Sequence, residues 1–304
     1  MPPDRTVPPD RCGYASPAMK LRVRHRLHYA FTTPVSHGPT LIRMRPRGDA
    51  EQAVLSHAMT VDPEPAGRAE LIGVLGEGVT QVWFGGPLDH FTVEAESVVV
   101  TGRENPFDFL IEHTASELPP DYSDVERQTL TPFFGSPDDG PACAELKDLV
   151  ESVAAESGRQ PVRFVAELAR RIADSIEVKV RPEGDAWPPS RTLSEGTGSC
   201  RDVAVLFNAA ARLEGIPTRF VSGYQYQGDG ADPTGHELHA WSEACLPAVG
   251  WRAFDATAGT AVDGRYVAVT AAPGQAGTLP TRGSFTGDAE QSLEAVVEIE
   301  RLRD

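Results

Sequence analysis

The chain has no long apolar segment. It is 304 residues long and 40% hydrophobic, but it contains no apolar run of about 18 residues, the length a membrane-spanning helix needs. Its first twelve residues are rich in Pro, Asp and Arg and lack the apolar core of a signal peptide. We therefore expect a cytoplasmic protein with no membrane partner and with a disordered tail over residues 1–19.

Cysteine is also scarce. The four cysteines are Cys12, Cys143, Cys200 and Cys245, and their spacing fits neither a disulfide framework nor a zinc ribbon. His236 and His239 could be combined with Cys200 and Cys245 into a metal site. However, Cys200 has no close ligand pair, and the two histidines lack the spacing of the zinc-protease helix. We expect no metal and no cofactor.

Basic residues are outnumbered, with 28 Lys and Arg against 44 Asp and Glu. Residues 1–50 hold nine basic and three acidic residues, so the acidic excess lies wholly in the remainder. An acidic body disfavours nucleic acid and anionic membranes as partners. Six arginines near the start could form a basic patch, but we prefer to place them on solvent-facing sides of strands: Arg22, Arg24, Arg26, Arg43, Arg45 and Arg47.

The first third of the chain has no convincing helical pattern. Apolar residues alternate with polar ones, as in half-buried antiparallel strands. The predicted strands are residues 21–29, 40–46, 52–61, 78–84 and 90–101, with a turn at 34–39. This pattern predicts an antiparallel β-sandwich-like domain over residues 20–104.

Helical periodicity begins after a Pro- and Phe-rich connecting arm, residues 105–140, whose phenylalanines should anchor it to the second domain. Helices are predicted at 143–156, 162–176 and 200–213, a loop at 182–190 and a turn at 192–195. Strands are predicted at 218–226, 239–246 and 250–255. The sequence thus predicts an α+β core over residues 141–272, with the third helix packed on an antiparallel sheet, and a C-terminal extension, residues 273–304, ending in a strand.

The sequence Gly-Thr-Gly-Ser-Cys-Arg-Asp at residues 196–202 places Cys200 at the first turn of that third helix. Unpaired backbone N–H groups and the positive end of the helix dipole favour a thiolate there. Glycines at Gly196 and Gly198 allow close backbone approach to a substrate. Taken alone, Cys200 could also be a buried structural cysteine.

Two later strands favour a catalytic role for Cys200 over a structural one. His239 opens one and Asp255 ends the next. A cysteine at a helix start, followed by a histidine and a carboxylate on adjacent strands, has the order of a nucleophile, its base and the residue that orients the base. We therefore interpret Cys200, His239 and Asp255 as a catalytic triad.

These motifs resemble those of the bacterial transglutaminase-like family. The segments that carry the resemblance are residues 192–202, 220–224, 238–243 and 250–257, together with Asn-Pro-Phe-Asp at 105–108. The resemblance implies a papain-like core, a Cys200–His239–Asp255 triad, and a peptide, protein or small amide as substrate. Many relatives have glutamine where this chain has Trp187, whose indole N–H is either an oxyanion donor or only a stacking surface. Gly198, Ser199 and Trp241 are expected to line the cleft.

The expected reaction is acyl transfer through a thioester, with hydrolysis favoured over transamidation. The alternative is a non-catalytic binding protein that keeps the same shell. Residues 227–235, rich in Gly and Asp, are interpreted as a lid, with a calcium site at Asp229, Asp232 and Glu237 as the competing possibility. The sequence leaves the oligomeric state open.

Overall fold

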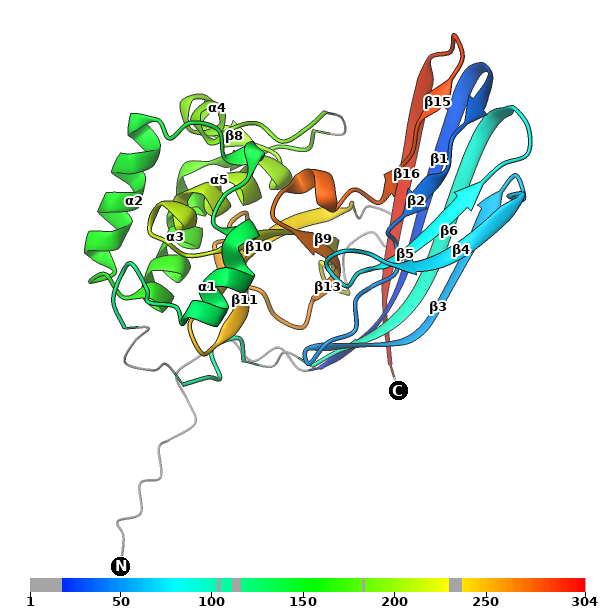
Figure 1. Ribbon diagram of the computed structural model, residues 1–304. Coiled ribbons are helices and arrows are strands. Elements are labelled where there is room, and N and C mark those ends of the chain that lie inside the picture. The colour runs from blue at the N-terminus through cyan, green and yellow to red at the C-terminus, as the bar shows by residue number, and fades with distance from the viewer. Residues whose placement is uncertain (1–17, 103–104, 111–115, 182–183, 230–236, 304) are drawn as a thin grey trace, which may run out of the picture.

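The molecule has two parts, one built of strands and one that combines helices with strands (Figure 1). The computed structural model describes residues 18–102, 105–110, 116–181, 184–229 and 237–303. A blue-to-cyan group of long strands and the red C-terminal strand stand on one side, and the green helices stand on the other. No helix among the described residues is long and apolar enough to cross a membrane. Residues 1–17 of the predicted tail lie outside the described residues.

The long strands form a β-sandwich. One sheet contains β15 (Phe285–Thr286), β1 (Met19–His37), β6 (Leu88–Thr101) and β3 (Gln52–Asp62), with β16 (Gln291–Leu302) also paired to β1. The other contains β14 (Thr281–Arg282), β2 (Thr40–Ile42), β5 (Gly78–Trp83) and β4 (Gly67–Ile72). Leu27, Ile42, Val82 and Phe91 belong to one buried cluster drawn from both sheets. Alternating burial along β6 follows the alternating sequence.

Some strand boundaries differ from the prediction. β1 continues to His37 through the predicted turn, because its register against β6 shifts between Ala30 and Val35. Pro34 lies inside that irregularity, where it removes no ladder hydrogen bond. β2 ends at Ile42, short of the predicted 40–46. The prediction also omitted β4, whose six residues are all partly or fully exposed and show no apolar alternation.

The arm contains more regular structure than the turns predicted for it. Helix α1 (Asp124–Leu130) starts at a capping box formed by Ser123 and Glu126, and two short 3-10 turns, η2 (Thr131–Phe133) and η3 (Pro137–Asp139), come after it. Phe133 packs on Trp251 with ring centroids 5.0 Å apart. This contact anchors the arm to the core, as predicted.

The core is an α+β unit. Its helices are α2 (Ala144–Glu156), α3 (Pro161–Ser175), α4 (Pro189–Glu195) and α5 (Cys200–Leu213). Its sheet runs in the order β12 (Thr260–Ala261), β11 (Gly250–Asp255), β10 (His239–Leu246), β9 (Thr218–Gln225) and β13 (Tyr266–Ala272). A parallel pair, β7 (Glu177–Val178) and β8 (Thr197–Gly198), leads into α5, and a 3-10 turn, η4 (Gln275–Gly277), comes after β13.

The prediction omitted α4, β8, β12 and β13 of the core. The predicted loop and turn contain α4, which has Pro189 at its first position and the left-handed Gly196 at its end. These are ordinary start and stop signals of a helix. β13 is buried at six of its seven positions, so its sequence shows no alternation.

The C-terminal strand returns to the first strand of the chain. β16 pairs antiparallel with β1 from Phe31–Gln291 to Lys20–Leu302. On this sheet Arg22 pairs with Glu300 at 2.8 Å and Arg24 with Glu96 at 3.0 Å, so these arginines lie on a solvent-facing side, as we preferred. The same placement is wrong for Arg47, which forms an ion pair with the buried Glu243 of β10.

Candidate active site

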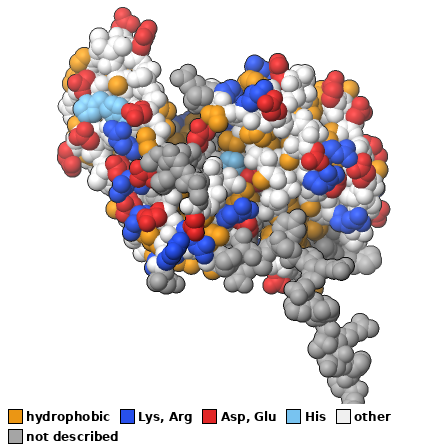
Figure 2. Space-filling model, turned by 180° about the vertical axis from the view of Figure 1, so that it is seen from behind, with side chains coloured by type: hydrophobic (Ala, Val, Ile, Leu, Met, Phe, Trp, Pro, Cys, Tyr) orange, Lys and Arg blue, Asp and Glu red, His pale blue; other side chains and the backbone are white. Residues whose placement is uncertain are grey.

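Cys200 is the first residue of α5 and is half-buried. Its side chain packs, together with Ala186, against a small apolar cluster that α5 forms with β9 and β10. The backbone N–H groups in a helix's first turn lack intrahelical acceptors, so Cys200 lies in a locally positive field. From behind, the surface is hollowed between the β-sandwich and the core (Figure 2).

Asp202 organises the chain around Cys200, a role that was not predicted from the sequence. It is fully buried, and its Oδ2 accepts hydrogen bonds from the backbone N–H and the hydroxyl of Ser199, both at 2.7 Å. Its Oδ1 accepts from the backbone N–H of Trp187 at 2.7 Å and from Arg181 at 2.6 Å. Asp202 thus fixes the loop before α4 beside the start of α5. The Ser-x-x-Asp spacing of a helix cap was the signal that could have identified it.

The second member of the predicted triad faces the third. His239 Nε2 lies 2.8 Å from Oδ2 of Asp255, which is fully buried. Asp255 Oδ2 also accepts from Tyr266 at 2.8 Å, and Oδ1 accepts from the backbone N–H and hydroxyl of Thr257 at 2.9 and 2.7 Å. Four donors hold this carboxylate. Since Nε2 is engaged, Nδ1 is the ring nitrogen left for Cys200.

The pKa values of the histidine and its partner move apart. Burial lowers the pKa of His239, but hydrogen bonds and charge from Asp255 and Cys200 outweigh it and raise the pKa well above its ordinary value. Burial raises the pKa of Asp255, and its hydrogen bonds with His239, Thr257 and Tyr266, with the charge of His239, outweigh this and lower it. Both shifts favour an imidazolium beside a carboxylate.

Aromatic rings support the histidine. The ring centroids of Trp241 and Tyr266 each lie 6.1 Å from that of His239. Trp241 is 2% exposed and meets Tyr266 edge-on at 5.4 Å. Gly223, the partner of His239 on β9, leaves room for the Trp241 ring, because a Cβ there would lie 2.6 Å from that ring.

The other predicted cleft residues are largely enclosed. Gly198 and Ser199 are buried, and a Cβ on Gly198 would lie 3.0 Å from Asp202. Trp187 is half-buried, with the guanidinium groups of Arg191 and Arg181 at 3.9 and 4.8 Å from its ring. The ring therefore has the stacking contacts that were one of its two predicted roles.

The predicted lid lies mostly outside the described residues, including Asp232, and so does His236 of the rejected metal site. Within the described part, Asp229 accepts a hydrogen bond from Tyr226 and faces Arg303 at 3.6 Å. No group of three His, Cys, Asp or Glu side chains among the described residues is placed to hold a metal ion.

Comparison with known proteins agrees with this architecture. Residues 21–100 match the bacterial transglutaminase-like N-terminal region, and residues 147–256 match the transglutaminase-like superfamily. The chain therefore has a transglutaminase-like core preceded by the bacterial transglutaminase-like N-terminal region, which confirms the resemblance seen in the sequence.

Individual relatives span nearly the whole chain. An uncharacterized protein of Mycobacterium leprae is 26% identical over 93% of this chain and 99% of its own length. One of Mycobacterium tuberculosis is 24% identical over 90% of both chains. A solved structure from Cytophaga hutchinsonii, proposed to be a cysteine protease, superposes with a TM-score of 0.70 at 20% identity, covering 96% of this chain and 93% of that one. The likeness confirms the fold, a papain-like core preceded by a β domain.

Proposed function

We propose that this protein is a cysteine hydrolase that cleaves amide or peptide bonds through a thioester on Cys200. The observation that carries the proposal is the 2.8 Å contact between His239 and the fully buried Asp255, next to a cysteine at a helix start. Burying a carboxylate costs free energy unless hydrogen bonds offset it, and the four donors keep Asp255 ionised beside His239, the state in which it can orient a catalytic histidine.

Each residue of the site has its own part in the reaction. The Cys200 thiolate attacks the carbonyl carbon while the imidazolium of His239 supplies a proton to the departing nitrogen, so that the C–N bond breaks and a thioester forms. The backbone N–H of Cys200 stabilises the oxyanion, and the Trp187 indole is a second candidate donor. Asp255 keeps the His239 ring oriented and stabilises its charge. Water then attacks the thioester, with His239 as the base, so that the C–S bond breaks, the carboxylic acid leaves and the Cys200 thiolate is restored.

Hydrolysis and transamidation share all steps up to the thioester and differ only in whether water or an amine attacks it. We propose hydrolysis, because water reaches a half-exposed Cys200 without a dedicated acceptor site. The substrate class is a peptide, protein or small amide. The reaction needs a reduced thiol, which fits the cytoplasmic location expected from the sequence.

The test combines a chemical and an enzymatic measurement. A small alkylating agent at neutral pH should modify Cys200 much faster than Cys143 or Cys245, located by peptide mapping. A panel of amides and peptides is then screened for release of ammonia or amine, with and without an added amine acceptor. Cys200→Ala should remove essentially all turnover on the best substrate. Equal alkylation of the three cysteines, or full activity of Cys200→Ala, would contradict the proposal, and equal alkylation together with binding of a panel member would favour the non-catalytic alternative.

A further inference from the structure

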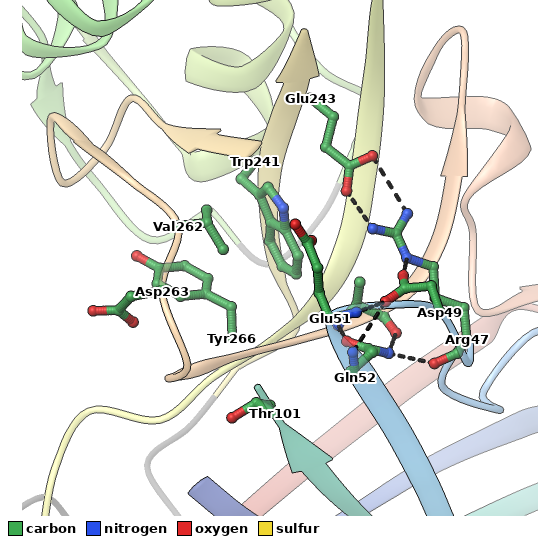
Figure 3. Close-up of a pocket in the computed structure, with 11 residues that line it drawn as sticks. Arg47, Asp49, Glu51, Gln52, Thr101, Trp241, Glu243, Val262, Asp263 and Tyr266 are labelled. Atoms are coloured by element: carbon green, nitrogen blue, oxygen red, sulfur yellow. Dashed lines mark hydrogen bonds and ion pairs between the residues drawn. The ribbon is translucent and has the colours of Figure 1, made fainter. Parts of the chain in front are cut away.

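A short segment of the β-sandwich, residues 47–52, lies against the core sheet, on the side to which Trp241 and Glu243 point (Figure 3). Arg47 of this segment binds the carboxylate of Glu243 with both terminal nitrogens. Glu243 is 2% exposed and lies on β10, the strand that begins with His239. This ion pair thus attaches the β-sandwich to the strand carrying the catalytic base.

The same segment holds β13. The Gln52 side chain accepts a hydrogen bond from the backbone N–H of Ala268 and donates one to its carbonyl, each at 2.8 Å. The backbone N–H of Arg47 donates to the same carbonyl at 3.1 Å. β13 has a register irregularity against β9 between Ala268 and Thr270. Such irregularities leave backbone groups unpaired and change where neighbouring side chains point, so Gln52 fixes β13 two residues from Tyr266.

A third contact reaches β11. Glu51 pairs with Arg252 at 3.0 Å, three residues before Asp255. The segment therefore contacts β10, β11 and β13. These strands carry His239, Asp255 and Tyr266 respectively.

The space between the segment and the sheet is too small for a substrate. The cavity lined by Arg47, Gln52, Trp241 and Glu243 measures about 20 Å³, which is enough for about one water molecule. Trp241, whose ring packs on His239, forms one wall of it. The region is a contact between the β-sandwich and the core. Any effect it has on the reaction must therefore act through the strands that it contacts.

We propose that residues 47–52 are a positioning element of the catalytic centre, which keeps three strands in register so that His239, Asp255 and Tyr266 meet beside Cys200. This inference rests on the proposed function, because it assigns the segment a role in that triad. It gives the β-sandwich a part in the reaction without contact with substrate. Arg47 and Gln52 are positioning residues, and a triad misplaced by about 1 Å loses much of its rate.

The test measures Cys200 alkylation as a function of pH, which needs no substrate. Arg47→Met keeps an unbranched apolar stem without the guanidinium and leaves Glu243 its second partner, Arg219. Gln52→Leu keeps the volume and removes the two hydrogen bonds to β13. In each variant we expect alkylation at pH 7 to slow by about tenfold or more and its midpoint to move to higher pH, because a misoriented imidazolium stabilises the thiolate less.

Arg219→Met is the matched control. Arg219 binds the same carboxylate, but from β9, which backbone hydrogen bonds already join to β10. It should lower the melting temperature as Arg47→Met does and leave the rate and midpoint of alkylation unchanged. If Arg47→Met does not fold, Gln52→Leu carries the test, since it leaves every charge paired.

Each outcome of this test either supports or contradicts the positioning role of residues 47–52. Wild-type rate and midpoint in Gln52→Leu or in folded Arg47→Met would overturn the proposal, leaving the segment a structural contact. An equal slowing in Arg219→Met would also overturn it, because the effect would then reflect general destabilisation. If wild-type Cys200 reacts no faster than Cys143 and Cys245, the proposed function itself fails. Fast wild-type alkylation with unaltered variants rejects only the positioning role.

Discussion

Strand β10 presents different side chains to its two neighbours. Towards α5 it presents Ala240, Ser242 and Ala244, which pack on that helix or bond to its backbone. Towards residues 47–52 it presents Trp241 and Glu243, both 2% exposed, in line with His239. The helix side is close-packed and almost wholly apolar. The sandwich side is held by ion pairs and hydrogen bonds of defined direction.

The difference separates stability from positioning. Apolar burial is non-directional and scales with area, so the α5 side stabilises the fold whatever the pH. Charge-assisted hydrogen bonds require a fixed geometry and an ionised carboxylate, so Arg47 fixes β10 only while Glu243 stays ionised. The proposed reaction needs a fixed geometry, and the strands that carry the predicted triad receive it from contacts outside the core.

The helix side should show the largest loss of stability. Phe207 of α5 is fully buried and stacks on Phe254 at 6.0 Å between ring centroids. Phe207→Ala should lower the free energy of unfolding by about 3–5 kcal/mol, measured by urea denaturation. The loss should be the same at pH 5 and pH 8, because no ionisable group is removed. Val125→Ala, at a residue 74% exposed on α1, is the control and should change little. A pH-dependent loss in Phe207→Ala would break the contrast between the two sides.

The sandwich side should instead show a pH-dependent loss. Burial raises the pKa of Glu243, but the charges and hydrogen bonds of Arg47 and Arg219 outweigh it and lower the pKa from 4.5 to about 2. A shift of that size corresponds to roughly 3 kcal/mol. Because the pKa is lower in the folded state, this stability is complete above about pH 4.5 and is lost as pH falls towards 2. Glu243→Gln should therefore destabilise the protein at neutral pH.

The measurement is the difference in free energy of unfolding between wild type and Glu243→Gln across pH 2 to 7. We expect roughly 3 kcal/mol at pH 7, shrinking steadily below about pH 4.5. Glu94→Gln, which removes a half-exposed carboxylate of the sandwich sheet, serves as the control for general charge effects. A difference that stays constant across this range would mean that Glu243 acts through packing alone.

These comparisons show which features of the fold and site could be predicted from the sequence. The His-Ala-Trp-Ser-Glu alternation predicted β10, and the helical spacing after Cys200 predicted α5, because both depend on local periodicity. The order of Cys200, His239 and Asp255 predicted which side chains to consider. The Arg47–Glu243 pair joins residues 196 positions apart. No local pattern encodes such a contact, so Arg47 was expected on a solvent face. Tyr266 was passed over for a similar reason, because its role depends on the carboxylate that the fold brings near its hydroxyl. Asp202 differs, because the Ser-x-x-Asp spacing of a helix cap is a local signal and was not used.

A smaller effect is expected from one donor to Asp255. Tyr266→Phe removes the hydroxyl that donates at 2.8 Å, while His239 and Thr257 continue to donate. A hydrogen bond to a charged group contributes about 1.5–3 kcal/mol. Because three donors to Asp255 remain, we expect the loss of transition-state stabilisation to lie near the lower end of that range. Turnover on the best amide substrate should fall by about tenfold with little change in KM, since the residue acts through Asp255. A change confined to KM would place Tyr266 in substrate binding instead.

The least effect is expected on the outer face of the β-sandwich, although it has the most ion pairs. Arg24 lies within 3.0 to 3.5 Å of Glu94, Glu96 and Glu298, but its side chain is 48% exposed. Water and salt screen such pairs, and holding a long side chain in place costs conformational entropy. Arg24→Met should leave the melting temperature and the alkylation of Cys200 unchanged at about 0.15 M salt. Arg47→Met, which removes the same side chain from a buried carboxylate, should change both. If the two substitutions behaved alike, burial would not be what distinguishes the sandwich side of β10, and the role given to residues 47–52 would lose its physical basis.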